Sequence, residues 1–427
     1  MNQTVHVRTY GCQMNKNDSD LILDLLAERG FVPAANPENA DILIINTCSV
    51  REHAERRALG YLATCRQWRG KGDRVLAVVG CMAKRRWREI MVQYPFVDLI
   101  LGPDDYRRIA DDLEEVVRQR TRIIRTDSRE EVYTGVRRRP RSPVCDFVSI
   151  TRGCSNYCAY CVVPMVRGPV RSRTPEDVLA EVQCLTAAGV RDITLLGQNV
   201  NEYRSGSTGF VDLLMRTTNI LERFRLRFLT SHPKDFDPRL IDAVREQEKL
   251  CDWFHLPLQS GSDRILTLMN RRYTRDDYRR IADAIRAQLP DATLTTDLIV
   301  GFPSETDAEF RQTLECVDEF GFDDAFTYRY SAREDTAASQ LPALPEPVIL
   351  GRLRELIAKQ TAATRSALER LRGAEREILF ERHVRDGTLG RTRGNTAVVV
   401  RDKRPLGEFV RVRIMEIEGK TPIGTIL

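Results

Sequence analysis

The hydrophobic positions of the first hundred residues form short continuous runs that alternate with amphipathic stretches. The runs have the length of buried strands and occupy residues 4–12, 41–48, 74–81 and 97–103. Between the first two, residues 18–30 have helical spacing, with Asp18 or Ser19 as the N-cap and Gly30 as the stop. Continuous apolar strands that alternate with helices predict a parallel sheet covered on both faces.

A second series of strands and helices follows a basic, proline-bearing stretch at residues 134–143, which is typical of a linker. Its strand candidates occupy residues 147–154, 192–198, 225–233, 253–259, 293–301 and 324–331. Six such strand–helix units predict an incomplete TIM-like barrel, (β/α)6, with its site at the C-terminal ends of the strands.

The chain changes character after a helical connector at residues 345–371, where short alternating strands with glycine turns predict a small antiparallel β-barrel. The sequence therefore predicts an α/β protein of three domains. These are an N-terminal parallel-sheet, Rossmann-like domain at 1–136, the partial barrel at 137–366, and the small barrel at 367–427.

The composition indicates a cytoplasmic location. The mean hydropathy is −0.36, and no apolar run approaches the roughly 18–20 residues of a membrane span. The N-terminus also lacks the features of a signal peptide. In the cytoplasm thiols stay reduced, so the eleven cysteines indicate metal binding, catalysis or burial rather than disulfides.

Three dispersed cysteines follow three strands of the predicted parallel sheet: Cys12, Cys48 and Cys81. The carboxyl ends of parallel strands lie along one edge, so these thiols are expected to converge on a shared metal site. The alternative is three buried cysteines that act as small hydrophobic residues. Cys65 lies within a helical stretch and is expected to be simply packed.

A compact cysteine motif, C-x3-C-x2-C, follows the first strand of the predicted partial barrel. Cys154, Cys158 and Cys161 can bind three irons of a [4Fe–4S] cluster and leave the fourth iron open. A zinc site would need a fourth ligand, and no histidine lies nearby. Tyr160 supplies an aromatic surface beside the last cysteine.

This motif resembles that of the radical S-adenosylmethionine (SAM) superfamily. The segments "CVVPMVRGPVRSR", "LLGQNVNEY", "TSHPKDF", "HLPLQSGSDRIL" and "DLIVGFPSET", together with the domain order, resemble the methylthiotransferases with a C-terminal TRAM domain. The start "TYGCQMNKNDSD" is similar to the MiaB branch of that family. Arg152 departs from the family pattern, which commonly has Glu there, and so does the segment 330–338.

The resemblance implies an activity: conversion of N6-isopentenyladenosine at position 37 of tRNA to its 2-methylthio derivative. It implies two [4Fe–4S] clusters and SAM as cofactors. Cys154, Cys158 and Cys161 would hold the radical-SAM cluster, and Cys12, Cys48 and Cys81 an auxiliary cluster that carries the sulfur. The expected partners are the tRNA anticodon stem-loop and an electron donor such as flavodoxin or ferredoxin, with no membrane and a monomeric chain.

Two other functions stay open at this point. One is the same chemistry on threonylcarbamoyladenosine in tRNA or on an Asp of ribosomal protein S12. The other is a metal-binding, RNA-binding module without catalysis. SAM cleavage by the iron-loaded protein separates the enzymes from the binding module.

Further candidate residues follow from position. Strand-end residues expected to contact SAM, besides Tyr160, are Gly197, Gln198, His232, Gln259 and Gly301, although turn geometry or burial explains them as well. Basic residues expected to bind tRNA phosphates are Arg137, Arg138, Arg139 and Arg141 in the linker, and Arg391 and Arg393 in the last domain. Three arginines follow the cysteine motif: Arg167, Arg171 and Arg173. They are expected to contact a carboxylate or tRNA phosphates, or to face solvent as surface arginines usually do.

Overall fold

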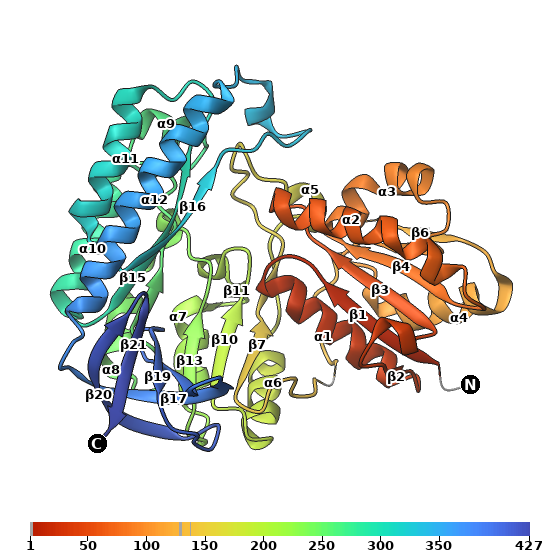
Figure 1. Ribbon diagram of the computed structural model, residues 1–427, viewed down its shortest axis with the longest axis horizontal. Helices are drawn as coiled ribbons and strands as arrows, with labels where there is room; N and C mark the ends of the chain where they lie inside the picture. The colour runs from red at the N-terminus through yellow and green to blue at the C-terminus, as the bar shows by residue number, and fades with distance from the viewer. Residues whose placement is uncertain (1–2, 128–129, 137) are drawn as a thin grey trace.

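The N-terminal part of the computed structural model, which describes residues 3–127, 130–136 and 138–427, is built on one six-stranded sheet. All of its neighbouring strands pair in parallel, in the order β2-β1-β3-β4-β5-β6 (Figure 1). The strands are β1 (Thr4–Thr9), β2 (Val32–Pro33), β3 (Ile42–Thr47), β4 (Val75–Gly80), β5 (Leu99–Leu101) and β6 (Ile123–Arg125). The predicted parallel sheet is confirmed.

Alternate residues of these strands face two separate cores. Ile42 and Ile44 of β3 pack with α1 and α4, whereas Leu43 and Ile45 pack with α2 and α3. Cys65 is buried in the second core, as expected. The helices are α1 (Gln13–Ala27), α2 (Glu52–Arg69), α3 (Cys81–Gln93) and α4 (Ile109–Gln119), with short 3-10 turns η1 (Pro37–Asn39) and η2 (Tyr106–Arg108).

Helix α1 begins earlier than the sequence pattern predicts. Its N-cap is Cys12, so Asp18 and Ser19 lie inside the helix and neither is the cap. Both side chains are buried, as are those of Asn15 and Asn17. Polar residues of this kind favour helix caps in general, but here they occupy a buried polar interface, which the pattern alone does not reveal.

The central part is an open barrel made of two three-stranded parallel sheets, β13-β10-β7 and β14-β15-β16. An isolated bridge between Leu226 and Leu250 connects the two halves. The strands are β7 (Cys145–Ser149), β10 (Asp192–Leu196), β13 (Arg225–Phe228), β14 (Trp253–His255), β15 (Thr293–Val300) and β16 (Asp324–Arg329). This arrangement agrees with the predicted partial (β/α)6 barrel.

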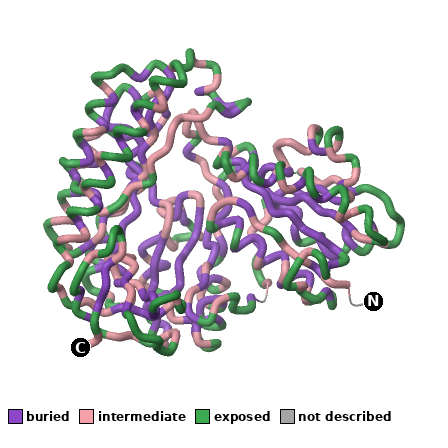
Figure 2. The backbone as a smooth tube through the Cα atoms, in the orientation of Figure 1, coloured by how far each residue is buried: buried purple, intermediate pink, exposed green. Residues whose placement is uncertain are grey.

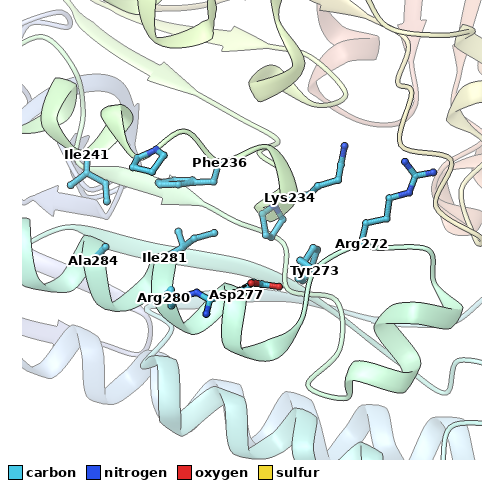
Figure 3. A pocket seen from close by; sticks show the side chains of 11 residues that line it. Lys234, Phe236, Ile241, Arg272, Tyr273, Asp277, Arg280, Ile281 and Ala284 are labelled. Carbon is cyan, nitrogen blue, oxygen red and sulfur yellow. Dashed lines mark hydrogen bonds and ion pairs between the residues drawn. The ribbon is translucent and has the colours of Figure 1, made fainter.

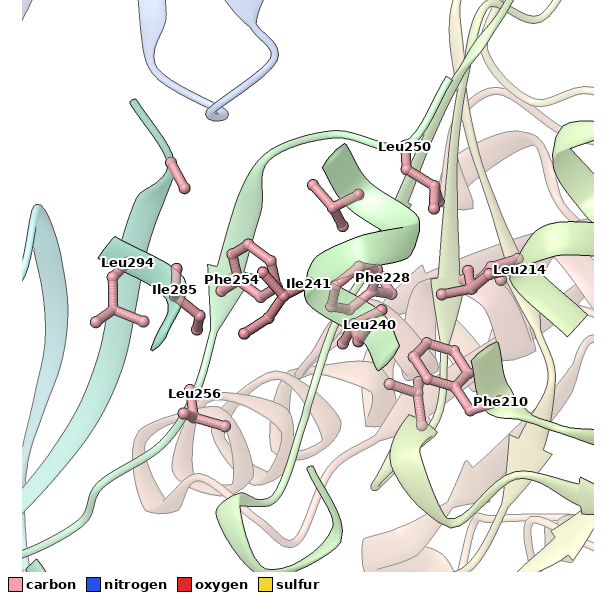
Figure 4. Close-up of a cluster of buried hydrophobic side chains, with 14 of the residues drawn as sticks. Phe210, Leu214, Phe228, Leu240, Ile241, Leu250, Phe254, Leu256, Ile285 and Leu294 are labelled. Atoms are coloured by element: carbon pink, nitrogen blue, oxygen red, sulfur yellow. The ribbon is translucent and has the colours of Figure 1, made fainter. Parts of the chain in front are cut away.

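Helices cover the outside of this barrel (Figure 1). They are α5 (Val163–Arg167), α6 (Pro175–Ala187), α7 (Phe210–Thr218), α8 (Arg239–Glu246), α9 (Asp263–Leu268), α10 (Arg275–Gln288), α11 (Asp307–Phe320) and α12 (Glu346–Glu369). The shorter elements are β8 (Thr151–Arg152), β9 (Arg171–Ser172), β11 (Arg204–Ser205), β12 (Thr208–Gly209), η3 (Val200–Glu202), η4 (Pro233–Asp235) and η5 (Ala337–Gln340). Figure 4 shows part of the apolar core between strands and helices, including Phe228, Phe254 and Ile285.

The C-terminal part is a closed five-stranded barrel in the order β17-β18-β19-β21-β20. Its strands are β17 (Glu375–Val384), β18 (Gly387–Thr392), β19 (Ala397–Val400), β20 (Phe409–Glu418) and β21 (Thr421–Ile426). The barrel is not wholly antiparallel, because β19 and β21 pair in parallel. Helix α12 ends at Glu369, beyond the boundary expected at residue 366.

Burial follows this architecture, with the strands largely buried and the covering helices exposed on their outer sides (Figure 2). Within the described ranges, no helix is both long and apolar enough to cross a membrane.

Candidate functional site

The three dispersed cysteines of the N-terminal domain come together at the carboxyl edge of its sheet. Cys12 caps α1, Cys48 follows β3, and Cys81 opens α3 directly after β4. Gly11 has φ +128°, and a Cβ placed on it would lie 2.4 Å from Cβ of Cys48. The loop that carries Cys12 therefore packs directly against Cys48, and only glycine fits there.

The three thiols differ in pKa because their surroundings differ. A hydrogen bond from the Cys48 thiol lowers the pKa of Cys12, and the same contact, together with burial, raises the pKa of Cys48 well above its ordinary value. Burial also raises the pKa of Cys81. The Cys12 thiol is thus the one most readily ionised, which favours a metal ligand.

The compact motif forms one loop between β8 and α5. The amide of Cys161 donates to the carbonyl of Cys158 at 2.9 Å, which closes a tight turn around the last two cysteines. Burial raises the pKa of Cys154 and of Cys161 to about 12. Thiols so placed stay protonated until a metal displaces the proton.

Each cysteine triplet receives a hydrogen bond from a buried arginine. Nη1 of Arg271 donates to the sulfur of Cys158 at 3.4 Å, and Nε of Arg167 donates to the sulfur of Cys81 at 3.2 Å. Arg167 lies on α5 of the central barrel, so its bond to Cys81 crosses from one domain to the other.

Asp18 fixes Arg167 in this position. Its carboxylate pairs with Arg167 at 2.6 Å and with Arg152 at 2.8 Å, and all three side chains are 3% exposed or less. Burial disfavours the charged carboxylate, but the two arginines outweigh this effect and lower the pKa of Asp18. The site therefore includes a buried, charged contact between the two domains.

The donor sets fit clusters better than single ions. Among the described residues, no three His, Cys, Asp or Glu side chains are placed to bind one metal ion. A [4Fe–4S] cluster makes a different demand, because each cysteine binds a different iron. Within each triplet the thiols lie close enough to affect one another's pKa: Cys12 and Cys81 act on Cys48, and Cys154 and Cys158 act on Cys161. Three neighbouring cysteines of this kind meet that demand.

The carboxyl ends of the barrel strands carry buried polar atoms that have no hydrogen-bond partner in the described part of the chain. They are Gln198 Oε1, Asn199 Oδ1, Asn201 Oδ1 and Nδ2, His232 Nε2, Gln259 Oε1 and Tyr330 OH. Buried polar atoms are normally hydrogen-bonded. A ligand with several donors and acceptors, such as SAM, would satisfy them.

Three of the residues expected to contact SAM belong to this set or lie beside it. Gln198 and Gln259 contribute their side-chain oxygens, and Gln259 has a positive φ of 72°. Burial lowers the pKa of His232 to about 2, so the ring is neutral. Nδ1 accepts from the amide of Lys234 at 3.2 Å, so Nε2 carries the proton and is a donor without a partner among the described residues. Tyr160 packs against the small apolar cluster that contains Met269 and Phe302.

The two expected glycines have packing reasons. A Cβ on Gly197 would lie 2.2 Å from the hydroxyl of Thr151, and one on Gly301 would lie 2.7 Å from Ile349. The backbone of Gly197 thus approaches the strand that leads into the cysteine motif. These contacts account for both glycines without any ligand.

The basic linker is largely occupied by contacts within the protein. Arg138 is buried and pairs with Asp24 at 3.0 Å, and Arg141 pairs with Asp24 and with Asp20. A guanidinium buried in this way is not available to a phosphate, so the expected tRNA contact of Arg138 is not supported. Arg139 is exposed, and Arg137 lies outside the described residues.

The side chains of the two arginines of the C-terminal barrel are held within the protein. Nη2 of Arg393 donates to the carbonyl of Leu250 of the central domain at 2.5 Å, whereas Arg391 pairs with Glu381 of the same small barrel at 3.1 Å. Arg171 pairs with Asp104 at 2.9 Å, and Arg173 pairs with Asp177 at 2.6 Å. Of the contacts expected for the arginines after the cysteine motif, the structure shows ion pairs with carboxylates of the protein itself. The expectation that these arginines face solvent is wrong.

Two cavities lie away from the cysteines. One, of about 960 Å³, lies between the amino-terminal ends of the central-barrel strands and the C-terminal barrel, and is lined by Phe147, Trp253 and Arg227, among others. The other, of about 440 Å³, lies on the outside between η4, α8 and α10, where Figure 3 shows Lys234, Arg272 and Tyr273 around it. No cysteine of either triplet lines these cavities.

Sequence reasoning missed Arg271 and Asp18 as parts of the site. Arg271 lies more than a hundred residues after Cys158, with no motif to connect the two. Asp18 carries a signal, because a run of six polar residues at positions 15–20 interrupts an otherwise amphipathic helix, but a cap explains such a run equally well.

Comparison with protein-family models matches three segments of the chain. Residues 148–317 match the radical SAM superfamily, residues 4–102 the uncharacterized protein family UPF0004, and residues 369–427 the TRAM domain. Among solved structures, the radical S-adenosylmethionine methyltransferase TsrM from Kitasatospora setae has a similar fold, with a TM-score of 0.59 at 14% identity over 79% of this chain and 77% of that one. Fold and cysteine sites thus define a radical-SAM protein with a TRAM domain.

Curated relatives narrow this class. The tRNA-2-methylthio-N(6)-dimethylallyladenosine synthase of Moorella thermoacetica is 41% identical over 425 residues, which cover 96% of both chains. The protein of the same name from Thermodesulfovibrio yellowstonii is 38% identical and covers 100% of this chain and 99% of its own. The chain belongs to the family of the tRNA-2-methylthio-N(6)-dimethylallyladenosine synthases, and with it goes the use of SAM and [4Fe–4S] clusters.

Proposed function

We propose that this protein converts N6-isopentenyladenosine at position 37 of tRNA to 2-methylthio-N6-isopentenyladenosine. The isopentenyl group is the dimethylallyl group in the name of its relatives. The observation that carries the proposal is the pair of cysteine triplets, together with the contact that Arg167, on the helix directly after the compact motif, makes with Cys81 of the dispersed triplet across the domain interface.

Cys154, Cys158 and Cys161 would hold one [4Fe–4S] cluster, and Cys12, Cys48 and Cys81 the other. When bound, the first cluster with SAM supplies radical chemistry for C–H activation, and the second supplies sulfur. Three thiolates per cluster leave one iron of each without a protein ligand. The chain's own contribution is to gather each set of three cysteines and to connect the dispersed set to the central barrel through Arg167.

The residues around the barrel mouth bind and orient the cosubstrate in this proposal. The unpartnered oxygens of Gln198 and Gln259 accept hydrogen bonds from the SAM amine or ribose, and neutral His232 provides a further polar contact. Arg271 keeps the Cys158 sulfur in place through its hydrogen bond. Ordering a ligand by pre-placed polar groups lowers the entropic cost of reaching the reactive geometry.

The segment after β16 closes the barrel against the N-terminal domain near Cys48. The hydroxyl of Ser331 donates to Glu52 at 2.9 Å, and Arg333 donates to the carbonyl of Val50, two residues after Cys48, at 3.4 Å. In this proposal the contact limits the access of water to the dispersed triplet near Cys48, which would protect reactive intermediates from side reactions.

The tRNA would enter through its anticodon stem-loop, with base 37 flipped towards the barrel mouth. Exposed arginines such as Arg139 would contact phosphates, so binding is expected to weaken with salt. We further propose a reduced flavodoxin or ferredoxin as the electron donor, a monomeric chain and a cytoplasmic location.

The test is the nucleoside content of tRNA. The gene is expressed in a strain that lacks methylthiotransferases and that makes both isopentenyl- and threonylcarbamoyl-adenosine, and digested tRNA is analysed by mass spectrometry. The methylthio-isopentenyl nucleoside is expected with the intact chain and is lost with Cys158→Ala or Cys48→Ala. A methylthio-threonylcarbamoyl product, or no product with iron-loaded protein, overturns the proposal.

Anaerobic reconstitution then separates the two cysteine triplets. Cys48→Ala is expected to keep SAM cleavage but lose methylthio transfer, whereas Cys158→Ala loses both activities. Stoichiometric zinc without SAM cleavage would instead support a binding module.

A further inference from the structure

The hydrogen bond to the dispersed cysteine triplet comes from the other domain. Arg271 and the Cys158 that it contacts both belong to the central barrel, at a distance of 3.4 Å. Arg167 also belongs to the central barrel, but its Nε lies 3.2 Å from the sulfur of Cys81 in the N-terminal domain. The first contact is local to its domain, whereas the second exists only when the two domains are docked.

The charges around Arg167 do not balance. Arg152 and Arg167 share one carboxylate, that of Asp18, and all three side chains are 3% exposed or less. Asp104 lies on the neighbouring loop, but it pairs with Arg171 at 2.9 Å. One positive charge of the Asp18 cluster therefore lacks a carboxylate partner, and burial makes such a charge costly unless an anion lies nearby.

Arg167 also has a hydrogen-bond donor that is not used within the described residues. Its Nη1 atom is buried and has no partner in the part of the chain that the structure describes. Its Nη2 atom is held by Asp18 at 2.6 Å, and its Nε faces Cys81. A buried cation with a free donor, close to the thiols of Cys81 and Cys12, indicates an anionic, sulfur-rich acceptor at this place.

We propose that Arg167 is the positioning residue of the auxiliary cluster, and that through it the central barrel sets the reduction potential of a cluster held by the other domain. This inference rests on the proposed function, in that it requires a cluster on Cys12, Cys48 and Cys81. Hydrogen bonds and positive charge beside cluster sulfurs stabilise the reduced, more negative state and so raise the potential.

The experiment isolates each cluster in the full-length chain. A parent protein with Cys154, Cys158 and Cys161 all changed to Ala retains only the auxiliary site and is reconstituted anaerobically. Its midpoint potential is then measured by redox titration followed by EPR. In this background Arg167→Gln is expected to lower the potential, Arg167→Lys to lower it less because the charge is kept, and Arg271→Gln to leave it unchanged.

The complementary parent, in which Cys12, Cys48 and Cys81 are changed to Ala, retains only the cluster site of the compact motif and provides the matched control. There Arg271→Gln is expected to shift the potential and Arg167→Gln is not. Equal effects of both arginines in both backgrounds, or no shift with Arg167→Gln, overturn the inference. If Arg167→Gln does not retain its cluster, an unchanged potential in Arg167→Lys overturns it instead. Absence of iron from the first parent overturns the proposed function itself.

Discussion

Arg138 of the linker lies 3.0 Å from Asp24 of α1, and both side chains are almost fully buried. This ion pair attaches the linker between the first two domains to the N-terminal domain. Removing one partner of a buried pair typically costs about 3–5 kcal/mol when it leaves a charge uncompensated, and the cost here is smaller because Arg141 still pairs with Asp24. Arg138→Met is therefore expected to lower the thermal unfolding midpoint of the protein, measured by circular dichroism.

The exposed neighbour Arg139 is expected to behave in the opposite way. Arg139→Ala leaves the unfolding midpoint almost unchanged but weakens tRNA binding and reduces the slope of log affinity against log salt by about 1. Fluorescence anisotropy with a labelled tRNA at several salt concentrations measures both effects. A smaller salt slope for folded Arg138→Met than for Arg139→Ala would contradict this assignment.

Arg227 of β13 anchors the C-terminal barrel. It donates to the carbonyls of Arg393 at 2.7 Å and Thr392 at 2.8 Å, and it pairs with Asp192 at 2.8 Å. Arg227→Met is expected to loosen this contact and to speed amide exchange in residues 387–400, measured by hydrogen–deuterium exchange. Arg223→Ala provides the control, because Arg223 also contacts this barrel, through Glu377, but is 64% exposed. Equal exchange in both variants would show that Arg227 is not the anchor.

The parallel sheet and the meeting of Cys12, Cys48 and Cys81 at one edge follow from the sequence, because parallel strands fix where their carboxyl ends lie. The order of the strands within the sheet does not follow from the sequence pattern. Nor do the roles of Asp18 and Arg167, since each depends on a contact between side chains 149 residues apart. The local sequence pattern predicts that Asp18 is a helix cap and that Arg138 contacts phosphate, because Asp and Arg side chains are usually exposed. Only the docking of the domains places these charges in the interior.

His232 is expected to make stability depend on pH. Burial holds its pKa at about 2 in the folded protein, against an ordinary value of about 6.5. The unfolded chain therefore binds a proton that the folded chain does not, and stability falls as the pH drops below about 6.5. His232→Gln removes this proton uptake, so its unfolding midpoint should fall less steeply between pH 7 and pH 5. Parallel curves for the two proteins would contradict a neutral, buried His232.

Gly11→Ala is expected to abolish the auxiliary cluster without unfolding the protein. The new Cβ would lie 2.4 Å from Cβ of Cys48, at a φ of +128° that side-chain-bearing residues rarely adopt. The methyl group must therefore displace either Cys48 or the loop that carries Cys12, and the three sulfurs no longer line one space. The iron content after anaerobic reconstitution should fall by about half, and SAM cleavage should persist, because Cys154, Cys158 and Cys161 are untouched.

Gly30→Ala is the matched control for this substitution. Gly30 also has a positive φ of 82°, but no atom lies within 4 Å of its added Cβ, so the iron content should match that of the parent. A full complement of iron in Gly11→Ala would show that Cys12 and Cys48 do not share a cluster.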